Sequence, residues 1–155
     1  EYFEKREDDL LDVYGYGWND ARHPNPFFTR LYRGIVDNKR EIYSRYYFVF
    51  CIDNSIAPGY ITYDPFIAMA TGAVPIYLPM PDAHKYIPAD TFINFSDFTD
   101  DLDGLVRHLQ EILQSGEYEQ YRKRGWAYLQ SKKFQPFTIE QFCEDIYQAM
   151  QRSFV

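Results

Sequence analysis

The sequence has few of the residues from which metal, redox and disulfide-bonded sites are built. Two of its 155 residues are cysteine and three are histidine, and none of them stands in a Cys-x-x-Cys or i, i+4 ligand pattern. These residues therefore give no metal site, and we expect no cofactor. We expect both cysteines to be small buried apolar residues, and we leave open a disulfide between them and the redox compartment. The five residues are Cys51, Cys143, His23, His84 and His108.

Long apolar runs and an excess of basic residues are also missing. No stretch approaches the roughly 18 uncharged apolar residues of a transmembrane helix. The chain opens at Glu1 without an initiator methionine or a signal segment, so we expect it to be a piece of a longer protein. The net charge is −7, from 16 basic and 23 acidic residues. A nucleic-acid binder needs a basic face, so we expect no nucleic-acid partner and no membrane segment.

The residues that are present are typical of one globular domain of alternating strands and helices. The chain is 46% hydrophobic and 25% charged, which excludes a disordered protein. Apolar and β-prone runs predict strands at 12–16, 47–52, 74–78 and 92–95. Helical spacing and capping residues predict helices at 37–46, 62–72, 100–115 and 117–131, and a last helix that begins with a capping box at residue 138.

Strands that alternate with helices of this length predict a mostly parallel sheet covered by helices on both faces. We therefore expect a Rossmann-like, three-layer α/β domain over 1–155, with its ligand site at the carboxyl ends of the strands. The continuous apolar run at 47–52 predicts a strand that is buried on both faces. Residues 18–34 have no periodic pattern and are expected to form an ordered loop.

The segment most suited to chemistry is the strand at 47–52 with the loop and helix that follow it. The free N–H groups and the dipole of a helix N-terminus attract anions, and Thr62 is the expected N-cap. Polar side chains in the loop can bind sugar hydroxyls, and Tyr60 can stack or donate its hydroxyl. An alternative is that Asn54 and Ser55 satisfy local backbone groups and that Tyr60 packs.

The same residues resemble a known family. Asp53-Asn54-Ser55, a spacer and Gly59-Tyr60-Ile61-Thr62, followed by the Gly-Ala-Val-Pro-Ile-Tyr run at 72–77, resemble the C-terminal domain of the α-1,3/1,4-fucosyltransferases, glycosyltransferase family 10. Segments 13–18, 46–48 and 81–95 fit further motifs of that family in the same order. The resemblance extends from about residue 9 to the C-terminus.

This resemblance implies the C-terminal half of a GT-B fold, which holds the nucleotide sugar GDP-fucose for transfer of fucose to a glycan acceptor with inversion. No metal is needed for that chemistry. The acceptor and the catalytic base are expected in an N-terminal domain absent from this chain, so the isolated domain should be inactive. The implied donor contacts are Asn54, Tyr60 and Thr62 with Ser55 beside them, and Asp53 stands where the family has glutamate.

One departure from the family pattern bears on the donor. The family's Glu-Lys pair, expected at the ribose and the pyrophosphate, is Tyr63-Asp64 in this chain. A carboxylate about 4 Å from a phosphate repels it. The repulsion costs about 1 kcal/mol of binding free energy in water and about 4 kcal/mol at an effective dielectric of 20. Two alternatives therefore stay open: a glycosyltransferase that uses another nucleotide sugar, and a non-catalytic binding domain. The acceptor, the linkage and the compartment also stay open, whether bacterial cytoplasm, membrane periphery or Golgi lumen.

Overall fold

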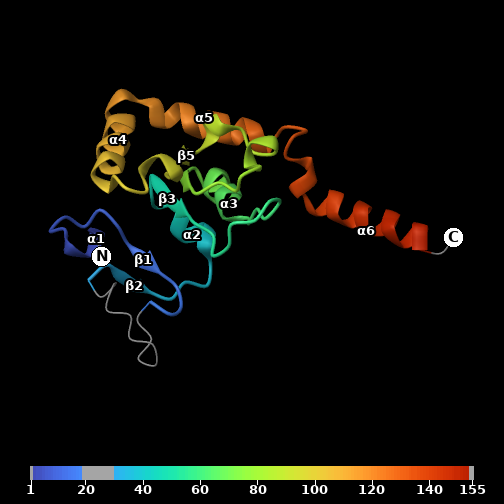
Figure 1. The fold of residues 1–155 in the computed structure, drawn as a ribbon, viewed down its shortest axis with the longest axis horizontal. Helices are drawn as coiled ribbons and strands as arrows, with labels where there is room; N and C mark the ends of the chain where they lie inside the picture. The colour runs from blue at the N-terminus through green and yellow to red at the C-terminus, as the bar shows by residue number, and fades with distance from the viewer. Residues whose placement is uncertain (1, 19–29, 154–155) are drawn as a thin grey trace. The chain divides into compact units, whose positions relative to one another are not determined.

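The computed structural model describes residues 2–18 and 30–153, which fall into two compact units, 1–42 and 43–155. The second unit contains a sheet of three parallel strands in the order β3-β4-β5. Phe48 pairs with Val74 at one end of β3 and Cys51 with Tyr77 at the other. These strands confirm three of the four predicted ones, and their bounds are β3 Phe48–Cys51, β4 Val74–Tyr77 and β5 Ile93–Asn94 (Figure 1).

Side chains alternate between the two faces of this sheet and build a separate apolar core on each. Cys51 and Tyr77 point into a core shared with Phe66 and Met69 of α3 (Asp64–Thr71). Val74, Ile76 and Ile93 point into the other core, which they share with Leu105 of α4 (Leu102–Ser115). α5 (Glu117–Leu129) follows, and its Tyr128 side chain is buried in the first core. The three-layer α/β arrangement is therefore as predicted.

The strand at 47–52 is parallel, as predicted, but it is not buried on both faces. Within the described residues β3 pairs only with β4, so it is an edge strand of this sheet. Cys51 is buried, whereas Phe48, Val49 and Phe50 are half-buried. The central strand is β4, in which all four residues are buried. A continuous apolar run is typical of both positions, so the prediction that this strand is buried on both faces is wrong.

α4 and α5 lie where helical spacing predicts them. The Asp101 carboxylate caps α4 by accepting from the Gly104 N–H group at 2.7 Å. Leu105, Val106 and Ile112 carry the predicted apolar stripe and are buried. Gly116, at φ +78°, ends α4 and precedes the first residue of α5. Its left-handed conformation is favoured by glycine, which explains the break between the helices. The short 3₁₀ turns are η1 Ala83–Lys85, η2 Ala89–Thr91, η3 Phe95–Phe98 and η4 Gln135–Phe137.

α6 (Ile139–Ser153) confirms the predicted last helix, and the Thr138 hydroxyl accepts from the Gln141 N–H group at 3.3 Å. Its apolar side chains are nevertheless exposed, with exposed fractions of 58% for Phe142 and 46% for Ile146. Cys143 is exposed too, so the prediction of two buried cysteines holds for Cys51 alone. An apolar residue on an amphipathic helix is buried only where another element packs on that face. Neither Cys51 nor Cys143 forms a disulfide bond within the described residues.

The first unit contains α1 (Tyr2–Lys5), β1 (Val13–Tyr14) and β2 (Tyr32–Gly34), and α2 (Lys39–Tyr43) spans the boundary between the units. β1 confirms the strand predicted at 12–16, but it pairs in parallel with β2 in a separate two-stranded sheet.

The loop predicted at 18–34 is wrong at β2, which is a strand. The sequence did not reveal it, because a strand of three residues is too short to leave a periodic signal. The remaining part of that predicted loop, 19–29 with His23, lies outside the described residues.

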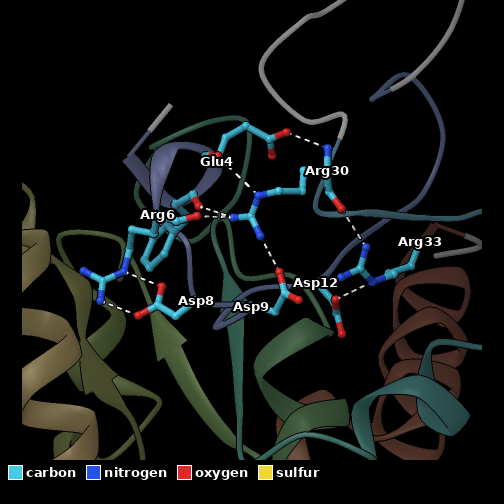
Figure 2. Close-up of polar contacts among 8 residues, drawn as sticks. Glu4, Arg6, Asp8, Asp9, Asp12, Arg30 and Arg33 are labelled. Carbon is cyan, nitrogen blue, oxygen red and sulfur yellow. Dashed lines mark hydrogen bonds and ion pairs between the residues drawn. The ribbon is translucent and has the colours of Figure 1, made fainter.

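Arginine side chains hold the first unit together (Figure 2). The Arg30 guanidinium donates to the carbonyl oxygens of Phe3 at 3.1 Å and Arg6 at 2.7 Å, at the end of α1, and to the Asp9 carboxylate. The Arg6 guanidinium donates to both oxygens of Asp8, which lowers the pKa of that carboxyl group. The Arg30 contacts satisfy carbonyl groups at the end of a short helix, where a cation is also favoured by the helix dipole.

No helix in the described part of the chain combines the length and the apolar character that are needed to cross a membrane.

Candidate functional site

The loop between β3 and α3 is anchored by Asp53, the second residue after the strand. One Asp53 oxygen, Oδ1, accepts a hydrogen bond from the Thr62 hydroxyl at 2.7 Å. The other oxygen, Oδ2, is buried and accepts no hydrogen bond from the described residues. This contact brings two predicted site residues together across the loop. It also leaves a carboxylate oxygen that can accept a further donor.

Thr62 is not the N-cap that the sequence predicts. The N-cap of α3 is Tyr63, whose side chain makes no capping hydrogen bond, and the helix begins at Asp64 with Pro65 in its first turn. The Thr62 hydroxyl instead donates to a carboxylate, and charge-assisted bonds of this kind are the stronger ones. The predicted end of the helix is confirmed, since Gly72 closes it in the left-handed conformation at φ +87°.

The tip of the loop is held by the segment that follows β4. The Gly59 N–H group donates to Asp82 Oδ1 at 3.0 Å, and the Ala57 N–H group donates to the Met80 sulfur at 3.2 Å. Within the loop, the Tyr60 N–H group donates to the Ala57 carbonyl at 3.1 Å. Sequence reasoning missed Met80 and Asp82, although loops at the carboxyl ends of neighbouring parallel strands are expected to meet.

The other predicted donor contacts lie at the surface of this loop. Asn54 and Ser55 are exposed, and their side chains make no hydrogen bond within the described residues. Tyr60 is 42% exposed. The alternative in which Asn54 and Ser55 satisfy local backbone groups therefore finds no support. Their role in binding a ligand stays a prediction.

Tyr77, the last residue of β4, is buried close to the negative charge of Asp53. Burial raises the pKa of Tyr77 to about 12, and the charge of Asp53 adds to that effect, while a contact with the Met80 backbone partly offsets it. Tyr77 is therefore a neutral phenol at physiological pH. The sequence placed it only in an apolar strand, because an apolar pattern does not reveal which aromatic residue faces a carboxylate.

The described residues contain no group of three or more histidine, cysteine, aspartate or glutamate side chains that could hold a metal ion. Two shallow hollows lie away from the loop after β3. One, of about 410 Å³, is lined by residues 136–139 and Phe142. The other, of about 370 Å³, lies between the end of α3 and α5. Neither includes a predicted site residue.

A polar loop at the carboxyl edge of a parallel sheet is common to many α/β families. Comparison with known proteins identifies the family of this chain. The model of the family described as "Glycosyltransferase family 10 (fucosyltransferase) C-term" matches residues 6–154. This chain belongs to that family. The resemblance seen in its motifs is therefore confirmed over almost the whole sequence.

Solved fucosyltransferase structures share the fold of this family member. One is described as "Crystal Structure of alpha1,3-Fucosyltransferase with GDP-fucose" and another as "Crystal Structure of alpha1,3-Fucosyltransferase". Each is 24% identical, has a TM-score of 0.51 and aligns with 60% of this chain. The alignments cover 30% and 29% of those proteins, so the chain spans less than a third of their length. No curated protein matches significantly.

Tyr63 and Asp64, which stand where the resemblance implies a Glu-Lys pair, lie where α3 begins. Tyr63 is 60% exposed, and Asp64 is half-buried in the first turn of the helix. Burial raises the pKa of Tyr43, and the charge of Asp64 raises it further, so the Asp64 carboxylate lies close to that phenol. A negative charge therefore stands at the helix N-terminus, where the resemblance implies a lysine at the pyrophosphate.

Proposed function

We propose that this chain is the donor-binding domain of a fucosyltransferase-like glycosyltransferase that binds GDP-fucose. The observation that carries the proposal is the family match over residues 6–154. The loop after β3 supports a donor site at this edge of the sheet, because its exposed polar side chains stand beside the N-terminus of α3.

In this proposal the chain's own residues hold the two ends of the donor. Asn54 and Ser55 accept hydrogen bonds from sugar hydroxyls or donate to them, and Tyr60 covers the ligand. Asp53 contributes its negative charge beside them, since its second oxygen is buried. The N–H groups of the first turn of α3 and the helix dipole face the pyrophosphate. Thr62 keeps Asp53 in place through their 2.7 Å hydrogen bond.

The proposed reaction is a single displacement. A hydroxyl oxygen of the glycan acceptor forms a bond to the anomeric carbon of fucose while the bond from that carbon to GDP breaks, which inverts the configuration. The acceptor proton passes to a base, and GDP leaves with the bonding electrons. Acceptor and base belong to the N-terminal domain that the resemblance implies, so we expect the isolated chain to bind the donor without turnover.

Titration of the 155-residue chain with GDP and GDP-fucose tests the proposal. We expect saturable heat by calorimetry and amide shift changes at residues 53–62. Tyr60→Ala should weaken binding, whereas Tyr147→Ala, which removes a tyrosine 56% exposed on α6, should not. Shift changes concentrated on residues 138–153 would place the ligand elsewhere.

The Tyr63-Asp64 pair favours a second candidate, a glycosyltransferase with another nucleotide sugar. The same titration with other nucleotide sugars separates the two candidates. The first requires GDP-fucose to bind more tightly than the other nucleotide sugars, whereas the second requires one of the others to bind more tightly. A chain that binds no nucleotide at all would be a non-catalytic domain that has kept the fold.

A further inference from the structure

The loop with the proposed donor contacts depends on another segment for its shape. It joins the end of β3 at Cys51 to the start of α3 at Asp64. A turn from Tyr60 N–H to the Ala57 carbonyl closes its tip. Among the described residues, Met80 and Asp82, after β4, contact this tip from outside.

The hydrogen bond that Asp82 accepts is unusual for a residue at its position in the fold. It is the N-cap of η1, where an aspartate ordinarily accepts from an N–H group of its own helix. Its side chain makes no such bond, and Oδ1 accepts instead from Gly59, 23 residues earlier in the sequence, at 3.0 Å. The side chain is only 18% exposed, and the Lys85 ammonium lies 4.0 Å from Oδ2. Asp82 is thus held toward the loop.

The residue that Asp82 holds is the one that sets the direction of Tyr60. Gly59 has a φ of +77°, in the left-handed region that few other residues adopt. Tyr60 follows it directly, so the backbone angles of Gly59 decide how the Tyr60 side chain leaves the turn. The Gly59 N–H group lies in the peptide unit from which this φ turns, and Asp82 fixes that unit. A bond to the Gly59 N–H group therefore acts on a proposed donor contact.

We propose that Asp82 is a positioning residue of the donor site, which orders loop 53–60 for the nucleotide sugar through its hydrogen bond to Gly59. This inference rests on the proposed function. Asp82 acts through the backbone of another segment and is not itself a contact to the donor.

The test compares Asp82→Ala with Asp82→Asn in the 155-residue chain, using GDP as the probe. Asp82→Ala removes the acceptor, and we expect about tenfold weaker GDP binding, the effect of one charge-assisted hydrogen bond. Asp82→Asn keeps an acceptor oxygen, and we expect affinity within about twofold of the parent. If Asp82 acts only as a charge near an anionic ligand, both variants will bind GDP more tightly, which would overturn the proposal.

Asp101 offers a matched control. Its carboxylate also accepts from a glycine N–H group, that of Gly104 at 2.7 Å, at the start of α4. Asp101→Ala should lower the melting temperature about as much as Asp82→Ala and leave GDP affinity unchanged. Equal losses of GDP affinity in the two variants would show general destabilisation and would contradict a positioning role.

Hydrogen exchange without ligand separates failure of this inference from failure of the proposed function. We expect the Gly59 and Tyr60 amides to exchange at least about fivefold faster in Asp82→Ala than in the parent or Asp82→Asn. Unchanged exchange would overturn the inference even if GDP binds. A parent chain that does not bind GDP would overturn the proposed function, and the donor role of Asp82 with it, whatever the exchange rates.

Discussion

The sheet core around β4 and the loop that follows β3 are adjacent in the fold but are stabilised in different ways. All four residues of β4 are buried, and they meet apolar side chains on both faces. The loop is held by a small number of directed bonds, from Thr62 to Asp53 and from Gly59 to Asp82. The stabilisation from apolar burial is roughly proportional to the buried area and needs no particular direction of contact. Each hydrogen bond instead depends on one donor and one acceptor.

This difference predicts that substitutions in the two regions have separate consequences. A change in the core should alter the free energy of unfolding and leave ligand affinity intact in the molecules that remain folded. A change in the loop should alter affinity or local order with a small effect on global stability. Each substitution below tests one side of that separation.

The largest effect is expected in the core. Ile76 is 1% exposed at the centre of β4, whereas Ile56 is 62% exposed in the loop. Ile76→Ala should lower the free energy of unfolding by about 2–5 kcal/mol, through lost burial and the cavity left behind. Ile56→Ala should change it by less than about 0.5 kcal/mol. Urea denaturation measures both, and similar losses would mean that the loop is packed like the core.

The next effect belongs to the loop side. Asp64→Lys removes a negative charge and adds a positive one at the N-terminus of α3, close to the proposed pyrophosphate. We expect GDP affinity to rise by about 1–3 kcal/mol, roughly ten- to a hundredfold. Added salt should reduce the gain if the site is open to water. The unfavourable helix dipole should cost at most about 1 kcal/mol of stability.

Tyr63→Glu should raise GDP affinity less, because a carboxylate restores only contacts to ribose hydroxyls. Calorimetric titration at two salt concentrations measures both variants. Equal affinities of parent and Asp64→Lys would mean that residue 64 does not face the donor. The motif at 60–64 would then be out of register with the family pattern.

A buried phenol in the core gives a pH-dependent test. Burial raises the pKa of Tyr128 to about 12, above the value of about 10 in an unfolded chain. The native state therefore holds this proton between pH 10 and 12 while the unfolded state releases it, so stability present below about pH 10 is lost as the pH rises through 12. At about 1.36 kcal/mol per pH unit, the loss should be at most about 3 kcal/mol.

Tyr128→Phe isolates this effect from other alkaline titrations. The Tyr128 hydroxyl is buried without a hydrogen-bond partner among the described residues, so its removal should be neutral or slightly stabilising at pH 7. The variant should then lose less stability than the parent between pH 10 and 12. Denaturation at each pH measures the difference, and parallel curves would show that the phenol reaches water in the native state.

The contrast between apolar burial and directed hydrogen bonds also explains why the sequence predicted the core better than the loop. Periodic apolar residues located strands at 74–78 and 92–95 and the buried stripe of α4 around Leu105, because burial follows pattern. The same pattern could not tell the edge strand from the central one. It also could not show that the Thr62 hydroxyl turns to Asp53, nor that Asp82 reaches Gly59, because those choices depend on tertiary geometry.

α4 and α6 show the limit of periodicity most directly. Both were predicted from apolar residues at helical spacing, and both are helices. Ile112 of α4 is 1% exposed, whereas Ile146 of α6 is 46% exposed. The sequence therefore establishes that a helix has an apolar face, and only the packing of a second element decides whether that face behaves as core.

The smallest effect is expected for Ile146→Ala in α6, and the same substitution at Ile112 in α4 is its matched comparison. Ile112→Ala should cost about 2–5 kcal/mol of unfolding free energy, since a buried side chain is truncated in a packed core. Ile146→Ala should cost nothing or stabilise the helix by up to about 0.5 kcal/mol, because alanine is the better helix former at an exposed position. Urea denaturation at two protein concentrations measures both. A loss above about 1 kcal/mol for Ile146→Ala that grows with concentration would show that a second copy covers this face in solution, so that α6 would behave as core.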